Sequence, residues 1–292
     1  MYVSLNGKLV KKEEAVISPF DHGYMYGLGV FETFRTYGGH PFLLEDHINR
    51  LNKALEELNI SKTFAVEEAA QLVRDLLQKN GWEDAYIRFN VSAGIGEIGL
   101  QTGSYEHPTV ILYGKPLTGV YSAEKELVLL KTARNTPEGN ERIKSHHYLN
   151  SILGKRELAD PLNQEGLFLT KEGDIAEGCV SNIFWMKDGT LFTPAVSTGI
   201  LNGITRQFIL LLADTLNIPA EVGHYKIEEL LQADEVFLTN SIQEIVPVCS
   251  FAGTRFPGSA GKMTEFLQRK YDANKYSLLS MDELRKGGHH HD

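Results

Sequence analysis

Two different hydrophobic periods alternate along the first 115 residues. Leucine and isoleucine residues recur every three or four positions from Leu44 to Leu58, and this spacing predicts an amphipathic helix. A second helix is predicted over about 66–79, where Gly81 would end it. Shorter apolar or alternating runs predict strands at 31–37, 41–43, 85–92 and 109–113. The first part of the chain is therefore expected to form a compact α/β unit.

Two glycine-containing segments interrupt this pattern. Asn6-Gly7 stands between the apolar runs 2–5 and 8–10 and predicts a hairpin, because a type I′ turn needs positive φ at both central residues. The segment 18–29 is rich in glycine and aromatic residues. Such density indicates either a close approach of the backbone to a ligand or another chain, or simply a tight loop.

Strands predominate in the second half of the chain. They are predicted at 126–132, 166–170, 182–186, 190–193, 220–225, 235–239 and 246–250, and a short strand is expected to end near Glu177. Helices are predicted at about 145–159, 205–216, 227–232 and 261–274. Helices of unequal length without a regular βα repeat favour an α+β fold over a doubly wound sheet.

The pattern changes at Lys115-Pro116-Leu117-Thr118-Gly119, which has the composition of a connection between domains. We expect an N-terminal α/β domain at 1–115, a connection at 116–120, a C-terminal domain at 121–280 and a tail at 281–292. The last residues contain three consecutive histidines, and they are either a tag remnant or a native tail.

Composition narrows the possible functions. The chain has 292 residues, 42% of them apolar and 23% charged, which is the balance of a globular protein with a sizeable core. A net charge of −9 without a basic cluster argues against nucleic acid or an anionic membrane as the main partner. Two cysteines, no apolar leader and no membrane-length apolar run favour a reducing cytoplasm.

Several common catalytic motifs are absent. The sequence contains no Gly-x-x-x-x-Gly-Lys-Ser/Thr phosphate loop and no Gly-x-Ser-x-Gly nucleophile turn. It also lacks His-Glu-x-x-His and paired Cys-x-x-Cys motifs, so no metal site is expected. The adjacent His146 and His147 would point about 100° apart on a helix, which is poor geometry for binding one metal ion.

One lysine and one glutamate stand out because of the motifs around them. Lys144 precedes a predicted helix in Arg142-Ile143-Lys144-Ser145-His146-His147-Tyr148-Leu149-Asn150, and Glu177 precedes Gly178 at the end of a short strand. Taken alone, each is more readily explained as a solvated surface residue. The segments 203–205 and 239–241 have the composition of helix-entry turns, where a serine or threonine is often only a helix cap.

Together these motifs resemble the fold-type IV family of pyridoxal-phosphate (PLP) enzymes, which includes branched-chain and D-amino-acid aminotransferases and aminodeoxychorismate lyases. The resemblance runs from Asn6-Gly7 to about Arg269. It is carried, in order, by Tyr26-Gly27-Leu28-Gly29-Val30-Phe31-Glu32-Thr33, His47-x-x-Arg50-Leu51, Lys144-x-x-x-Tyr148-Leu149, Glu177-Gly178-x-x-Ser181-Asn182-Ile183-Phe184, Gly203-Ile204-Thr205-Arg206 and Glu235-Val236-Phe237.

The resemblance implies a role for each matching residue toward the cofactor. Lys144 would hold the PLP aldehyde covalently and then move protons as the catalytic base. Glu177 would keep the pyridine nitrogen protonated. The remaining residues implied to bind the cofactor are Arg50, Tyr148, Ile204, Thr205 and Ser241. Tyr148 would face the same side of a helix as Lys144, and the others would bind the phosphate.

The reaction within the family is less sharply indicated. Arg88, Phe31 and Asn182 are the implied substrate-binding residues, with Arg88 on a strand suited to binding a carboxylate. D-amino-acid aminotransferases carry a tyrosine at the position of Phe31, and branched-chain aminotransferases usually have Phe-Glu-Gly where this chain has Phe31-Glu32-Thr33.

The run from Lys144 to Asn150 and the segments 135–139 and 92–94 instead resemble bacterial 4-amino-4-deoxychorismate lyases. That branch converts 4-amino-4-deoxychorismate to 4-aminobenzoate and pyruvate, a step toward folate. A branched-chain or D-amino-acid aminotransferase remains the alternative, and a non-catalytic protein that binds PLP or a metabolite is the second alternative.

The resemblance also implies an architecture. It predicts a smaller α/β domain, a larger pseudo-barrel domain, and cofactor in the cleft between them. It further implies a homodimer, with the glycine-aromatic segment 24–29 close to the partner's site.

Overall fold

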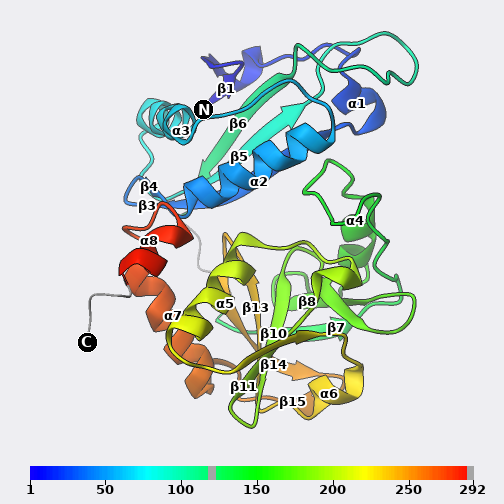
Figure 1. The fold of residues 1–292 in the computed structure, drawn as a ribbon, viewed down its shortest axis with the longest axis vertical. Coiled ribbons are helices and arrows are strands. Elements are labelled where there is room, and N and C mark those ends of the chain that lie inside the picture. The colour runs from blue at the N-terminus through cyan, green and yellow to red at the C-terminus, as the bar shows by residue number, and fades with distance from the viewer. Residues whose placement is uncertain (118–122, 288–292) are drawn as a thin grey trace. The chain divides into compact units, whose positions relative to one another are not determined.

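A computed structural model describes residues 1–117 and 123–287, which divide into two compact units (Figure 1). Unit 1 contains residues 1–117 together with Ile143–His147 and Lys275–Gly287, and unit 2 contains 123–142 and 148–274. The chain passes between the two units more often than the expected boundaries at 115, 121 and 281 imply. Part of the expected connection, 118–120, and the histidine run at 289–291 lie outside the described residues.

Unit 1 is built on an antiparallel sheet in the order β2-β1-β6-β5-β3-β4. The strands are β1 (Tyr2–Leu5), β2 (Lys8–Lys11), β3 (Gly29–Tyr37), β4 (His40–Pro41), β5 (Ala85–Ser92) and β6 (Thr109–Pro116). The predicted hairpin is confirmed, because Asn6 and Gly7 join β1 to β2 with φ of 49° and 79°.

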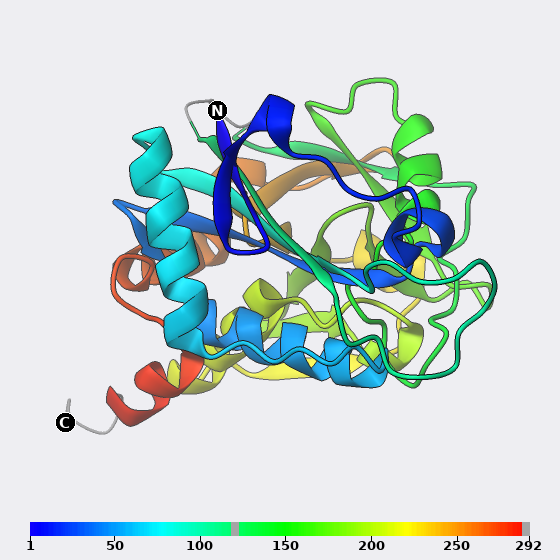
Figure 2. The ribbon, with the colours of Figure 1, turned by 90° about the horizontal axis from the view of Figure 1, so that it is seen from above.

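Two long helices cover this sheet and complete the core of unit 1. Helix α2 (Leu44–Glu57) packs on β3, while α3 (Val66–Asn80) packs on β1 and β6. Figure 2 shows α2 and α3 running in clearly different directions beside the sheet. The leucine-isoleucine stripe of α2 is buried, including Leu44, Ile48 and Leu55 at 0% exposure, which confirms the predicted amphipathic helix.

Shorter helices complete unit 1. They are the 3-10 turn η1 (Lys12–Glu14), the helix α1 (His22–Tyr26) inside the glycine-aromatic segment, and α8 (Met281–Gly287). The expected tail thus begins with a helix, and its first N–H, from Met281, donates to the Asp46 carboxylate of α2 at 2.9 Å.

Unit 2 is built on a mixed sheet in the order β12-β11-β10-β13-β14-β7-β8-β9, with β15 paired to β14. The strands are β7 (Lys125–Leu129), β8 (Gln164–Leu169), β9 (Ile175–Gly178), β10 (Asn182–Lys187), β11 (Thr190–Pro194), β12 (Ala220–Gly223), β13 (Glu235–Asn240), β14 (Glu244–Phe251) and β15 (Thr254–Arg255). The last strand in this order, β9, also approaches β10 and β11, so the sheet curls into a half-barrel. The predicted α+β fold is confirmed.

Helices cover the half-barrel from several sides (Figure 1). They are α4 (Leu149–Arg156), α5 (Ile204–Thr215), α6 (Ile227–Leu231) and α7 (Lys262–Asn274), with 3-10 turns η2 (Val196–Thr198) and η3 (Gly258–Ala260). Helix α4 packs on β8, α5 on β12 and β13, and α7 on β13 and β14. Trp185, Phe237 and Val248 are among the buried residues of the sheet.

Two of the predicted local structures are wrong. The helix expected from residue 145 begins only at Leu149, because the preceding segment pairs with β3 instead. The segment 239–241 is not a helix entry: Thr239 and Asn240 end β13, and Ser241 lies in the hairpin turn before β14. At 145–148 pairing with the distant strand β3 prevails over the local composition, and at 239–241 the antiparallel pairing of β13 with the next strand, β14, does so.

The N-terminus of α7 gives a first test of the fold. Glu235 of β13 accepts hydrogen bonds from the backbone N–H groups of Met263 and Thr264 at 3.0 and 2.8 Å, and from the Thr264 hydroxyl at 2.7 Å. We expect Glu235→Ala to lower the free energy of unfolding by about 1–2 kcal/mol, the usual effect of losing a helix cap. Urea unfolding measures this, and Glu265→Ala on the exposed side of α7 is the control. Equal effects of the two substitutions would contradict the capping role.

Candidate functional site

Lys144 is held beside β3 by backbone hydrogen bonds. The Phe31 N–H donates to the Lys144 carbonyl at 2.9 Å, and the His146 N–H donates to the Gly29 carbonyl at 3.0 Å. Val30 and Ser145 form an antiparallel bridge between the two segments. The lysine is therefore fixed by strand pairing and not by a helix, so the expectation that Lys144 and Tyr148 share one side of a helix is wrong.

The side chains of this segment gather around the Phe31 ring. The Lys144 ammonium lies 4.7 Å from the ring centre, and the Arg88 guanidinium lies 3.5 Å from it. Arg88 is on β5, directly opposite Thr33 of β3, and its side chain reaches the Asn90 amide oxygen at 3.3–3.4 Å. Unit 1 thus places two cations against one aromatic ring, an arrangement that suits an anionic ligand.

A neutral histidine adjoins these cations. The ring centre of His146 lies 6.4 Å from that of Phe31, and burial, reinforced by the charge of Arg88, lowers the pKa of His146 to about 4. Its Nε2 atom is buried and has no hydrogen-bond partner among the described residues. Gly29 makes this packing possible, because a Cβ there would collide with the His146 ring.

Arg50, on α2, is held by a buried carboxylate. Glu32 of β3 accepts hydrogen bonds from Nε and Nη2 of Arg50, both at 2.7 Å, and from Nδ1 of His47 at 2.7 Å. Burial alone would raise the pKa of Glu32, but the Arg50 charge and the His47 hydrogen bond outweigh it and lower the pKa to about 2. A bidentate ion pair of this kind fixes the direction of the guanidinium.

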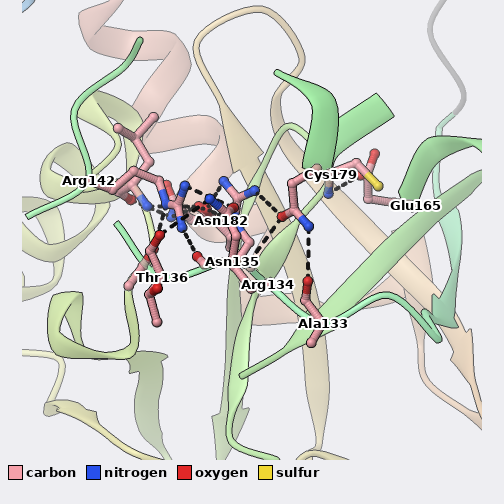
Figure 3. A network of polar contacts seen from close by, with 12 residues as sticks. Ala133, Arg134, Asn135, Thr136, Arg142, Glu165, Cys179 and Asn182 are labelled. Carbon is pink, nitrogen blue, oxygen red and sulfur yellow. Dashed lines mark hydrogen bonds and ion pairs between the residues drawn. The ribbon is translucent and has the colours of Figure 1, made fainter. Parts of the chain in front are cut away.

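Glu177 binds several polar groups of unit 2. Figure 3 shows a polar network of this unit that includes Arg134, Arg142 and Asn182. Glu177 lies near the end of β9, as predicted, and is 4% exposed. Arg134 contacts Oε1 through Nε at 2.8 Å and through Nη2 at 2.7 Å. The Leu201 N–H donates to Oε2 at 3.0 Å, and the Asn182 amide lies 3.4 Å from the same oxygen.

The amino end of α5 gathers hydrogen-bond donors. The first backbone N–H groups of a helix have no partner within the helix, and here they belong to Ile204 and Thr205. The Thr205 hydroxyl lies 3.2 Å from that of Ser241, in the turn between β13 and β14. Gly203 precedes the helix and contacts Asn182 so closely that a Cβ would collide with its Oδ1 atom. This arrangement suits a small anion such as a phosphate.

The candidate residues divide between the two units. Lys144, Arg50, Arg88 and Phe31 belong to unit 1. Tyr148, Glu177, Asn182, Ile204, Thr205 and Ser241 belong to unit 2. Within unit 1 the structure brings Lys144 and Arg88 together at Phe31. Within unit 2 it brings Glu177 to Asn182, and Thr205 to Ser241, while Tyr148 stands at the start of α4.

Comparison with known proteins identifies the family. The model of the class IV amino-transferases matches residues 29–251. The chain belongs to this family. It is 43% identical to an aminodeoxychorismate lyase of Bacillus subtilis over 98% of this chain and 97% of the relative. It is also 35% identical to a putative branched-chain-amino-acid aminotransferase of Methanocaldococcus jannaschii, over 97% and 100% of the two chains.

A solved structure extends the likeness to three dimensions. The branched-chain amino acid aminotransferase of Escherichia coli superposes with a TM-score of 0.86 at 30% identity, over 96% of each chain. The predicted family is confirmed, and with it the fold and the cofactor, because class IV enzymes use PLP. The chain is therefore an enzyme of the PLP-dependent class IV family, whose members include both lyases and aminotransferases.

The residues present fit PLP. In unit 2 the α5 terminus and the Thr205 and Ser241 hydroxyls offer donors for a phosphate dianion, and in unit 1 Arg50 is a guanidinium that suits an anion. Glu177 offers a carboxylate for a protonated ring nitrogen, and Lys144 offers the amine. In addition, Ser181 Oγ and Thr239 Oγ1 are buried without hydrogen-bond partners among the described residues, which is costly unless a polar ligand satisfies them.

Several polar residues of these networks were not singled out from the sequence. Glu32 and His47 stand in the quoted family motifs, but nothing local shows that Glu32 binds both His47 and Arg50. Arg134 lies in no motif, since its partner is 43 residues away. No group of three or more metal-ligating side chains occurs among residues 1–117 and 123–287. No helix in this part of the chain is long and apolar enough to cross a membrane.

The Glu32 network predicts a specific dependence on pH. The pKa of Glu32 is about 2 in the folded chain, against an ordinary value of 4.5. Its ionised form therefore stabilises the fold fully above pH 4.5, and this contribution is lost as the pH falls toward 2. We expect Glu32→Gln to lower the free energy of unfolding by about 3 kcal/mol at pH 7, since it leaves the Arg50 charge without its partner.

Urea unfolding measures the free energy of unfolding of the wild-type protein and of Glu32→Gln. The difference between these two free energies should become smaller as the pH falls from 4.5 to 2. Glu56→Gln, on the exposed face of α2, is the matched control. A difference that stays constant with pH would mean that Glu32 is not ionised in the fold.

Proposed function

We propose that this enzyme is a 4-amino-4-deoxychorismate lyase, which eliminates pyruvate from its substrate and forms 4-aminobenzoate for folate synthesis. The observation that carries the proposal is the 43% identity to the Bacillus subtilis lyase over nearly the full length of both chains. The run Lys144 to Asn150 and the segments 92–94 and 135–139, which resemble that branch, support it further.

Unit 1 supplies the base and the substrate-binding cation in this proposal. Lys144 holds the cofactor between turnovers and then moves the proton from C4 of the substrate. Arg88 binds a substrate carboxylate, and Phe31 packs against both cations. The pairing of Ile143–His147 with β3 supports these roles, because it fixes the lysine relative to Phe31.

Unit 2 supplies the groups that hold the ring and the phosphate. Glu177 would hold the protonated ring nitrogen of the cofactor, and Tyr148 would offer its hydroxyl to the cofactor. In unit 2 the amino end of α5, with Thr205 and Ser241, would bind the phosphate, and in unit 1 Arg50 keeps the phosphate-binding role that the family resemblance implies. Asn182 was expected to bind substrate, but its amide donates to the Leu201 carbonyl at 2.9 Å, so we assign it to supporting Glu177.

The chemistry requires little else from the protein. When bound, PLP supplies a ring that accepts the electron pair of the broken C–H bond. Lys144 removes the C4 proton, the bond between the ring carbon and the enolpyruvyl oxygen breaks, and the proton carried by Lys144 passes to the departing enolpyruvate, which becomes pyruvate. The carbocycle becomes aromatic, which supplies most of the driving force. The residues of the chain therefore mainly position one base and one leaving group.

A branched-chain aminotransferase is the second candidate. It is favoured by the 35% identity to the Methanocaldococcus jannaschii relative and by the TM-score of 0.86 to the Escherichia coli aminotransferase. Such an enzyme would form 2-oxoglutarate from L-glutamate and a branched-chain 2-oxo acid. The two reactions use the same base and cofactor, so the product made distinguishes them.

Replacing the base tests the lyase proposal. The substrate is generated in situ from chorismate and glutamine by an aminodeoxychorismate synthase, and 4-aminobenzoate is measured. We expect the wild-type protein to form 4-aminobenzoate, and Lys144→Ala to reduce the rate at least about 10³-fold, because the catalytic amine is lost. Lys8→Ala, on the exposed β2 hairpin, should leave the rate unchanged. Normal turnover by Lys144→Ala would contradict the assigned base.

We further propose that the enzyme acts as a homodimer, as the family resemblance implies. An apolar face of α4 supports this assembly. Leu149, Ile152 and Leu153 are 68%, 46% and 41% exposed, and their spacing places them on one side of the helix. Exposed apolar groups in such a row are typical of a surface that another chain covers.

The assembly has its own test. We expect the wild-type protein to have twice the chain mass in light scattering. Leu149→Glu with Ile152→Glu should shift it toward the monomer, because two charges would be buried without partners. Arg156→Glu on the same helix is the control for a change of surface charge. A monomeric wild-type protein would contradict the dimer without affecting the lyase proposal.

A further inference from the structure

Arg134 contacts Glu177 more closely than any other cation in unit 2. Its Nε and Nη2 atoms lie 2.8 and 2.7 Å from Oε1 of the carboxylate, whereas Nε of Arg142 lies at 3.9 Å. The side chains of Arg134 and Glu177 are 9% and 5% exposed, so water screens the interaction between their charges only weakly. A buried carboxylate held in this way has its direction fixed.

Arg134 is itself held in place by groups of unit 2. Its Nη1 atom donates to the Asn150 amide oxygen at 2.8 Å, and its guanidinium lies 5.2 Å from the centre of the Phe168 ring. Asn150 is fixed in turn, because its amide donates to the Ala133 carbonyl at 3.0 Å. Figure 3 shows Arg134 within this network, between Asn135 and Ala133. The guanidinium therefore has a single direction in which to present its donors.

The opposite oxygen of Glu177 is bound by a separate set of groups. Oε2 accepts the Leu201 N–H and faces the Asn182 amide. Arg142 binds the backbone of neighbouring segments. It donates to the Gly199 carbonyl at 2.6 Å and to the Asn135 carbonyl. The short hydrogen bonds of Arg142 thus go to backbone carbonyls, whereas Arg134 places two donors on the Glu177 carboxylate.

We propose that Arg134 is a positioning residue that aims the Glu177 carboxylate at the ring nitrogen of PLP. This inference rests on the proposed role of Glu177. A carboxylate can bind a ring N–H well only if it is correctly oriented, and the planar guanidinium directs it through two donors. Lysine would supply the charge from one flexible point and would restore the effect only in part.

A double-mutant cycle tests whether Arg134 acts through Glu177. The full-length apoprotein is titrated with PLP, and binding is followed by the absorbance of the bound cofactor. The variants are Arg134→Gln, Arg134→Lys and Glu177→Gln, with both arginine substitutions also made in the Glu177→Gln background. Arg156→Gln, an exposed arginine in the last turn of α4, is the matched control. Far-UV circular dichroism and urea unfolding verify the fold of each variant.

We expect Arg134→Gln to weaken PLP binding at least about tenfold in the wild-type background, the effect of losing hydrogen bonds between charged groups. In the Glu177→Gln background the same change should matter less than about twofold, because its target is gone. Arg134→Lys should bind PLP with intermediate affinity. At saturating PLP, Arg134→Gln should move the visible absorbance band in the same direction as Glu177→Gln, and Arg156→Gln should not move it.

The other outcomes contradict the proposal in distinguishable ways. An equal loss of PLP affinity in both backgrounds would mean that Arg134 has a structural role independent of Glu177. An unchanged PLP affinity of Arg134→Gln in the wild-type background would mean that Arg134 has no role in cofactor binding. If Arg134→Gln does not fold, the affinity and absorbance band of Arg134→Lys decide the same question. Normal PLP binding by Glu177→Gln, with an unchanged band, would instead remove the proposed role of Glu177, and with it this inference.

Discussion

The pairing of Ile143–His147 with β3 is the constraint on which the geometry of unit 1 depends. Three consecutive residues of β3, from Gly29 to Phe31, are engaged by the backbone of this segment. The pairing brings the side chains of Lys144 and His146 to the Phe31 ring, where Arg88 of the neighbouring strand β5 also lies. It also explains Gly29, where any side chain would collide with the histidine ring. A flexible lysine is thereby anchored by hydrogen bonds that do not involve its side chain.

Both units use buried ion pairs to fix a functional group. In unit 1, Glu32 binds Arg50 and His47, and in unit 2, Arg134 binds Glu177. Buried pairs contribute little net stability compared with apolar residues of the same size, because removing both charges from water is costly. Their value lies in orientation: a guanidinium and a carboxylate joined by two short contacts have one preferred arrangement. This reading accounts for the presence of such pairs beside the residues assigned to the cofactor.

Much of the fold could be predicted from local sequence, and the reasons are physical. The Asn6-Gly7 turn and the α2 stripe are determined by neighbouring residues, so pattern alone suffices. The helix start at Leu149 could not be predicted in this way, because pairing with the distant strand β3 decides it. At Ser241 the composition of a helix entry was misleading, because β13 and β14 pair there as a hairpin. The role of Arg134 also could not be predicted locally, because its partner is 43 residues away. The family motifs supplied the candidate residues, and their contacts required the structure.

A comparison of the two candidate reactions is the most direct test of whether this enzyme is a lyase or an aminotransferase. One preparation of the PLP-loaded protein would be given 4-amino-4-deoxychorismate generated in situ, and in parallel L-glutamate with a branched-chain 2-oxo acid. For a lyase, we expect equimolar pyruvate and 4-aminobenzoate in the first reaction. Their rate of formation should be far higher than the rate of 2-oxoglutarate formation in the second reaction. Rapid 2-oxoglutarate formation without 4-aminobenzoate would contradict the lyase assignment, while leaving the fold, the family and the cofactor as described.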